Sequence, residues 1–77
     1  MKIAFIGAGK MAEAMVGALI HKGGTPPHHI LAIDLAPARL QVMKDQYGVA
    51  TAAQAEAGVE FATTLVIAVK PQNLDAL

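Results

Sequence analysis

The feature that most restricts the fold of this chain is a glycine-rich turn between a short apolar run and an amphipathic segment. Ile3-Ala4-Phe5-Ile6 is an uninterrupted apolar run, as in a strand buried on both faces of a parallel sheet. It leads into Gly7-Ala8-Gly9-Lys10-Met11-Ala12, which fits G-x-G-x-x-G/A. From Lys10 to Lys22 apolar residues recur four positions apart and Gly23-Gly24 supplies a stop, so the spacing predicts a helix. This order of elements is typical of a nucleotide-binding α/β domain.

The next part of the chain repeats the pattern of strand and helix. The stretch Thr25–His29, which contains two prolines, cannot continue a helix, and Ile30–Ile33 is a second apolar run. Pro37 is well placed as the first residue of a second helix that ends at Gly48. Three residues of that helix are expected to lie near one face: Leu40, Met43 and Tyr47.

The last third predicts two more strands. Val49–Thr51 can form a short third strand, and Thr51 with Gln54 resembles a capping box that opens a brief Ala-rich helix stopping at Gly58. Leu65–Val69 is the fourth apolar run, and Gln72–Leu77 begin a further helical segment. We therefore expect one domain over residues 1–77, too short for two.

Strands that alternate with helices imply right-handed βαβ units. The expected fold class is α/β, a Rossmann-type doubly wound parallel sheet that is partial, with about four strands in the order 3-2-1-4. In that order the first and fourth strands are neighbours, so their carboxyl ends flank the crevice where such sheets bind ligands.

Composition excludes several classes of function. A hydrophobic fraction of 55% with 16% charged residues excludes a disordered segment. The net charge is zero and the basic residues are dispersed, so no nucleic-acid surface is expected. Cysteine is absent from the sequence, which removes disulfides and thiolate nucleophiles. The first apolar run is too short for a signal sequence or a membrane span, so we expect a cytoplasmic protein with no membrane partner.

Each small residue of the glycine turn has a physical task if a dinucleotide binds there. Gly7 permits the tight turn, Gly9 lets the backbone approach a pyrophosphate, and Ala12 keeps the helix close to the sheet, packing that Gly17 would assist. A Walker loop is disfavoured because Met11 follows Gly9-Lys10. Lys10 either adds a cation near the phosphates or is solvated. The alternative for the whole motif is a tight turn without ligand.

Asp34 ends the second apolar run at the distance expected for a carboxylate that binds the adenosine ribose hydroxyls. A 2′-phosphate there would be repelled, and Leu35 follows in place of a basic residue, so the sequence favours NADH. Arg39 is the nearby residue able to compensate. The alternative is that Asp34 caps the helix that begins at Pro37.

Two motifs together resemble the pyrroline-5-carboxylate reductase family. They are Ile6-Gly7-Ala8-Gly9-Lys10-Met11-Ala12-Glu13-Ala14 and Ala68-Val69-Lys70-Pro71-Gln72, and the likeness covers essentially all 77 residues. It implies a dinucleotide-binding domain followed by a helical domain, absent from this chain, that forms a homo-oligomer and shapes the substrate site. The implied reaction is reduction of the small molecule 1-pyrroline-5-carboxylate to L-proline with NAD(P)H.

The resemblance also implies roles for individual residues. Those that would hold the pyrophosphate are Ile6, Gly7, Ala8, Gly9, Lys10 and Met11, and those that would lie on the nicotinamide side are Ala68, Val69, Lys70 and Pro71. Lys70-Pro71 alternatively only terminates a strand. No catalytic residue is implied within this chain, so we expect the isolated 77 residues to be inactive.

The chain departs from the family at two positions. Members that prefer NADP usually have Ser or Asn near the position of Asp34, and many have Asp where this chain has Thr63, a change we interpret as structural. Two other functions remain open: a non-catalytic nucleotide-binding module, and a related NAD(P)-dependent dehydrogenase with another substrate, such as a hydroxyacid.

Some residues have simpler interpretations. His21 is expected to favour the negative end of the first helix dipole, and His28-His29 to form a solvated loop without metal. Methionines at helical spacing are expected to fill the core: Met11, Met15 and Met43.

Overall fold

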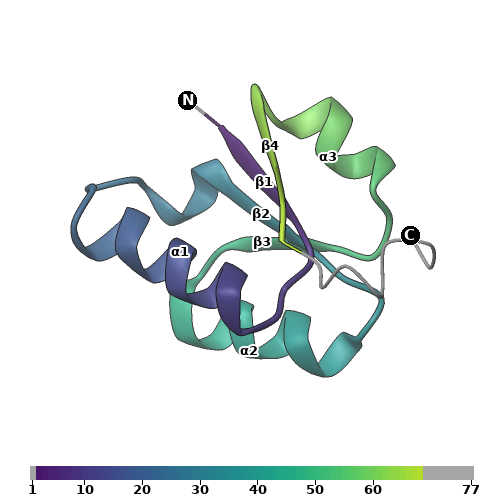
Figure 1. The fold of residues 1–77 in the computed structure, drawn as a ribbon, viewed down its shortest axis with the longest axis horizontal. Coiled ribbons are helices and arrows are strands. Elements are labelled where there is room, and N and C mark those ends of the chain that lie inside the picture. Colours follow the sequence, from purple (N-terminus) through teal and green to yellow (C-terminus); the bar gives the residue numbers. More distant parts are fainter. Residues whose placement is uncertain (1, 69–77) are drawn as a thin grey trace.

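The computed structural model describes residues 2–68, in which strands and helices alternate along the chain. The elements are β1 (Ile3–Ile6), α1 (Lys10–His21), a 3₁₀ turn (Pro27–His29), β2 (Ile30–Ile33), α2 (Pro37–Tyr47), β3 (Ala50–Ala52), α3 (Glu56–Phe61) and β4 (Thr64–Ile67). Within these residues the strands form a parallel sheet in the order β3-β2-β1-β4 (Figure 1). The predicted Rossmann-type order is therefore confirmed.

Helices cover both faces of the sheet (Figure 1). On one face α1 and α2 pack over β1 and β2, with Phe5, Val16 and Met43 completely or almost completely buried. On the other face α3 packs over Ala4 and Leu31. Because β1 and β2 lie at the centre and are covered on both sides, every residue in them is apolar. This explains why these two runs were predictable at their exact bounds.

The strands end at one level, which positions the crevice. Ile6 pairs with Ile33 on one side and with Ile67 on the other. The hydrogen bonding continues one residue further, since the amide of Gly7 donates to the Ile33 carbonyl at 2.7 Å and the amide of Ala68 donates to the Ile6 carbonyl at 2.8 Å. The loops after β1 and β4 therefore begin side by side.

Two predictions about the third crossover are wrong. Gly58 does not stop the helix but lies inside α3, where an added Cβ would stand 2.8 Å from Ile33 Cδ1 and 3.3 Å from Ala4 Cβ. Its small size is needed for close packing on the sheet, which sequence alone does not distinguish from a helix stop. The expected capping box fails because Thr51 lies within β3, and α3 begins after Ala55 without a side-chain cap.

The methionine prediction holds for one residue of three. Met43 is fully buried, whereas Met11 is 62% exposed and Met15 is 39% exposed. The reason is geometric, because α1 buries the narrow stripe of Ala12 and Val16 against the sheet. Met11 and Met15 are four residues apart and lie together on one side of that stripe.

The remaining differences are small. The third strand is shifted by one residue, to Ala50–Ala52, and the fourth begins at Thr64. The expected loop at Thr25–His29 contains the 3₁₀ turn. Val69 and the predicted segment Gln72–Leu77 lie outside the described residues. Within residues 2–68, no helix has the length and apolar character needed to cross a membrane.

Thr63 has the structural role expected for it. Its hydroxyl donates to the Lys2 carbonyl at 3.1 Å, and its oxygen accepts from the Lys2 amide at 3.3 Å. The Lys2 carbonyl also accepts from the amides of Thr63 and Thr64. These bonds align the start of β4 with the start of β1, far from the glycine turn.

Candidate cofactor-binding crevice

The glycine turn has the geometry that a phosphate group requires. Gly7 adopts φ 106°, a conformation that side chains disfavour, and Gly9 is the residue before α1. An added Cβ on Gly9 would meet no atom within 4 Å, so the space in front of this residue is open. Within the described residues no side chain caps α1, which leaves the first amides of the helix available to an anion. The residues present therefore fit a pyrophosphate.

Two small residues let α1 pack closely, one against the sheet and one against α2. Ala12 is completely buried against the sheet, as expected. Gly17 has a different partner from the one predicted, since its added Cβ would lie 3.5 Å from Cε1 of Tyr47. Gly17 thus lets α1 approach α2 and not the sheet.

The Asp34 side chain is hydrogen-bonded to the glycine turn. Its Oδ2 accepts from the Ala8 amide at 2.8 Å, and its Oδ1 accepts from the Ala36 amide at 2.9 Å. The alternative that Asp34 caps α2 is wrong, because Ala36 occupies the capping position and Asp34 forms a turn with the amide two residues on. A carboxylate offers about four acceptor sites, so the two oxygens retain capacity for ribose hydroxyls.

Arg39 contacts the same turn from α2. Its Nε donates to the Ala8 carbonyl at 2.7 Å, and its Nη2 donates to Oε1 of Glu13 at 2.7 Å. The Tyr47 hydroxyl donates to the other oxygen, Oε2 of Glu13, at 3.1 Å. Both backbone groups of Ala8 are therefore engaged, one by Asp34 and one by Arg39. This leaves the amides after Ala8 as the open donors of the turn.

Electrostatic effects follow from these contacts. The hydrogen bond from Arg39, and then that from Tyr47, lowers the pKa of Glu13 below its ordinary value of 4.5. Burial, and then the bond to Glu13, raises the pKa of Tyr47 above 10.0. Glu13 is therefore a carboxylate at neutral pH and Tyr47 is a neutral phenol.

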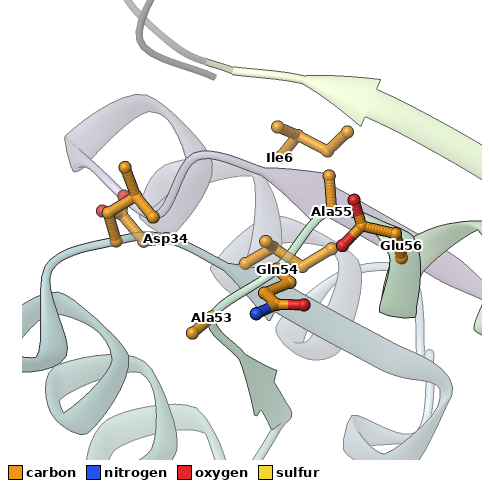
Figure 2. A pocket seen from close by; sticks show the side chains of 8 residues that line it. Ile6, Asp34, Ala53, Gln54, Ala55 and Glu56 are labelled. Atoms are coloured by element: carbon orange, nitrogen blue, oxygen red, sulfur yellow. The ribbon is translucent and has the colours of Figure 1, made fainter.

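Two hollows lie at the carboxyl ends of the strands. One, of about 340 Å³, lies beyond β1 and β2 and is bounded by the start of α3; Figure 2 shows Asp34 at one end and the Gln54 and Glu56 side chains at the other. The second, of about 420 Å³, is lined by Gly9, Lys10, Met11, Arg39 and Ala68. The two hollows share no lining residue, but Asp34 in the first and Arg39 in the second both hydrogen-bond Ala8. Both hollows therefore border the glycine turn, and we refer to them together as the crevice.

The structure brings together most of the predicted binding residues. Ile6 lines the first hollow, and Lys10 and Met11 lie exposed at the start of α1 beside the second. Ala68 is 8% exposed and lies beside the glycine turn. Val69, Lys70 and Pro71 lie outside the described residues.

Sequence reasoning missed the side chains that support and border the crevice. Glu13 accepts hydrogen bonds from Arg39 and Tyr47, which lie 26 and 34 residues away from it along the chain. A usable signal existed for the first pair, because Glu13 and Arg39 occupy early turns of two helices that both begin at the carboxyl edge of the sheet. Gln54 and Glu56 gave no signal, since the start of α3, near which they lie, was placed incorrectly. Within residues 2–68 no group of three His, Cys, Asp or Glu side chains is arranged to hold a metal.

Comparison with known proteins agrees with this geometry. The family model described as NADP oxidoreductase, coenzyme F420-dependent, matches residues 2–77. The chain belongs to this family. Membership supports a nicotinamide dinucleotide as the class of cofactor, which agrees with the open amides at the start of α1.

Individual relatives have one name in common. The chain is 36% identical over 70 residues to a pyrroline-5-carboxylate reductase of Escherichia coli, and 34% identical over 76 residues to one of Methanosarcina acetivorans. A solved pyrroline-5-carboxylate reductase structure from Coxiella burnetii is similar with a TM-score of 0.87 at 33% identity, over 97% of this chain and 27% of that one. The resemblance inferred from the two motifs is confirmed. The E. coli match covers 91% of this chain and 26% of the relative, so the chain spans about a quarter of the relatives' length.

Proposed function

We propose that this chain supplies the dinucleotide-binding part of an enzyme that reduces 1-pyrroline-5-carboxylate to L-proline. The observation that carries the proposal is the convergence of the glycine turn and the end of β4 at neighbouring strand tips, in a fold closely similar to a pyrroline-5-carboxylate reductase. The curated relatives bear the same name. Substrate binding and any oligomer would depend on sequence beyond this quarter of the relatives' length.

The cofactor would extend along the crevice. The amides of Gly9, Lys10 and Met11 would receive the pyrophosphate, with Asp34 accepting hydrogen bonds from the adenosine ribose. The adenine would enter the hollow beyond Asp34 (Figure 2), and the nicotinamide would lie towards Ala68 and the following Val69, Lys70 and Pro71. When bound, the reduced dinucleotide supplies the hydride that adds to the carbon of the substrate imine. Residues 2–68 would bind and orient the dinucleotide, and we assign none of them to the hydride-transfer step.

The activity is tested with the full-length protein that contains this chain. Oxidation of NADH or NADPH is followed by absorbance with 1-pyrroline-5-carboxylate, and L-proline is quantified as product. We expect proline to form in proportion to the dinucleotide oxidised, and the isolated 77 residues to form none. Oxidation of NADH or NADPH in the presence of a 2-oxoacid, but not of 1-pyrroline-5-carboxylate, would show that the protein is a dehydrogenase with another substrate. Dinucleotide binding without any turnover by the full-length protein would favour the non-catalytic module.

We further propose that NADH is preferred to NADPH. The Asp34 carboxylate is fixed by two backbone amides at the place proposed for the ribose, where a 2′-phosphate would meet like charge. Asp34→Ser should narrow the difference between the two dissociation constants, measured by nicotinamide fluorescence. Equal affinities in the unmodified protein would contradict the preference.

A further inference from the structure

We propose that Glu13 sets the cofactor preference by pairing with Arg39, a cation that hydrogen-bonds the same residue of the glycine turn, Ala8, as Asp34 does. The inference rests on the proposed dinucleotide site and goes beyond the role of Asp34. Asp34 and Arg39 bind the two backbone groups of one residue, Ala8, so the guanidinium lies close to the carboxylate that would receive the ribose. Such a cation would ordinarily offset the repulsion between Asp34 and a 2′-phosphate.

The contacts of Arg39 engage two of its five N–H donors and pair its charge with a carboxylate. Nε is engaged by the Ala8 carbonyl, and Nη2 is engaged by Glu13 at 2.7 Å, which is a short charge-assisted bond. The side chains of Arg39 and Glu13 are only 26% and 17% exposed, so solvent screens this ion pair less than one on the open surface. The positive charge of Arg39 is thus balanced before any ligand arrives.

Glu13 is itself held in place. The Tyr47 hydroxyl binds its second oxygen at 3.1 Å, and Gly17 allows the Tyr47 ring to approach α1. The carboxylate therefore cannot swing away from Arg39 without breaking a second hydrogen bond. Glu13 acts through Arg39 and is a specificity-positioning residue, whereas Asp34 would contact the cofactor directly.

The test compares dissociation constants of NADH and NADPH in the full-length protein. Glu13→Gln preserves the shape of the side chain and removes its charge, so we expect the affinity ratio to move towards NADPH by on the order of tenfold. The shift should shrink at high salt and disappear when Arg39→Gln is added. Tyr47→Phe, which keeps the ion pair, is the matched control and should change the ratio by less than about twofold.

A second variant keeps the proposal testable if Glu13→Gln folds poorly. Arg39→Gln alone leaves the Glu13 carboxylate without its partner, so the affinity ratio should move towards NADH, opposite in sign to Glu13→Gln. A ratio that moves towards NADPH in Arg39→Gln would overturn the proposal, as would equal weakening of both dinucleotides in Glu13→Gln. Failure of the unmodified protein to bind either dinucleotide would instead refute the proposed site itself, and this inference with it.

Discussion

Gly58 illustrates how a single hydrogen in place of a methyl group determines the distance between a helix and the sheet. Its Cα faces Ile33, Leu65 and Ala4, and an added Cβ would stand 2.8, 3.2 and 3.3 Å from their nearest side-chain atoms. The Ala4 methyl is fixed to the backbone of β1 and cannot rotate away. Enlarging residue 58 must therefore move α3 or rearrange the side chains beneath it.

We predict that Gly58→Ala is less stable than Gly17→Ala by about 1–3 kcal/mol in urea unfolding. Both glycines lie inside helices, so the gain in helix propensity is common to the two variants and cancels. The added methyl at position 17 would meet Tyr47 at an ordinary contact distance of 3.5 Å. Equal stabilities would show that α3 packs less closely than described.

The two glycines of the turn should respond differently to the same substitution. Gly7→Ala should cost about 1–2 kcal/mol of folding free energy, because φ 106° is strained for any side chain. Gly9→Ala should leave stability within about 0.5 kcal/mol, since its φ of −79° is ordinary and its Cβ would enter open space.

The binding measurement completes this comparison. The Cβ of Gly9→Ala would occupy the space proposed for the pyrophosphate, so this variant should bind NADH at least about tenfold more weakly while melting normally. A variant at position 9 with unchanged affinity would place the phosphates elsewhere.

Among the elements, α1 and α2 are joined through the carboxylate of Glu13, which makes their association dependent on pH. The folded pKa of Glu13 is lowered by Arg39 and Tyr47 from an ordinary value of 4.5. The stabilisation is therefore fully present above 4.5 and is lost as the pH falls through the lower folded value. We expect Glu13→Gln to melt below the unmodified protein at pH 7, and the difference to vanish at a pH below the folded pKa of Glu13.

Glu60→Gln is the matched control for this pH dependence. It removes the same charge from an exposed position on α3. Its melting temperature should follow that of the unmodified protein at both pH values. A difference between Glu13→Gln and the unmodified protein that persisted in acid would indicate a packing defect in place of a lost ion pair.

Sequence reasoning succeeded for elements whose position is dictated by local pattern. The central strands are uninterrupted apolar runs, and α2 begins at Pro37 and ends at Gly48, which adopts the left-handed conformation at φ 71°. It failed where a residue serves a partner that is distant in sequence. Gly58 fits the pattern of a helix stop until Ala4 and Ile33 are placed beneath it. Likewise, only the packing of α1 shows which side of α1 is buried.

The candidate site divides in the same way. The glycine turn and Asp34 were predictable because their spacing follows a strand that precedes a turn. The hydrogen bond from Tyr47 to Glu13 was not, because it depends on how two helices lie against each other. The pairing of Glu13 with Arg39 could be anticipated only from the shared sheet edge at which both helices begin. The pairing of Arg39 with Glu13 beside the glycine turn becomes visible only when the two helices are placed in the fold.

Taken as a whole, the described part of the molecule leaves an apolar border along β4. Leu65 is 45% exposed and Ile67 is 66% exposed, and a hollow of about 400 Å³ with almost entirely apolar walls lies beside Phe5 and Val66. β4 is an edge strand within residues 2–68. Exposed apolar edges of this kind favour association.

We therefore predict that the isolated 77-residue polypeptide self-associates as its concentration rises, measured by sedimentation velocity. Ile67→Lys should reduce this association, because a charge on an edge strand opposes pairing. Gln46→Lys adds the same charge on α2 and should leave it unchanged. A monomer at all concentrations, or equal effects of the two lysines, would exclude β4 as the contact.

The double engagement of Ala8 has a consequence for redesign of coenzyme usage. Asp34 is at once the proposed discriminator of the ribose and the acceptor that restrains the phosphate-binding turn. Replacing Asp34 to admit NADPH would also remove the hydrogen bond to Ala8 that restrains the turn. Ordering the released turn on binding would then cost free energy and weaken the affinity for the coenzyme. A change at Glu13 alters charge while leaving that restraint intact, so evolution or engineering can retune selectivity there without loosening the loop.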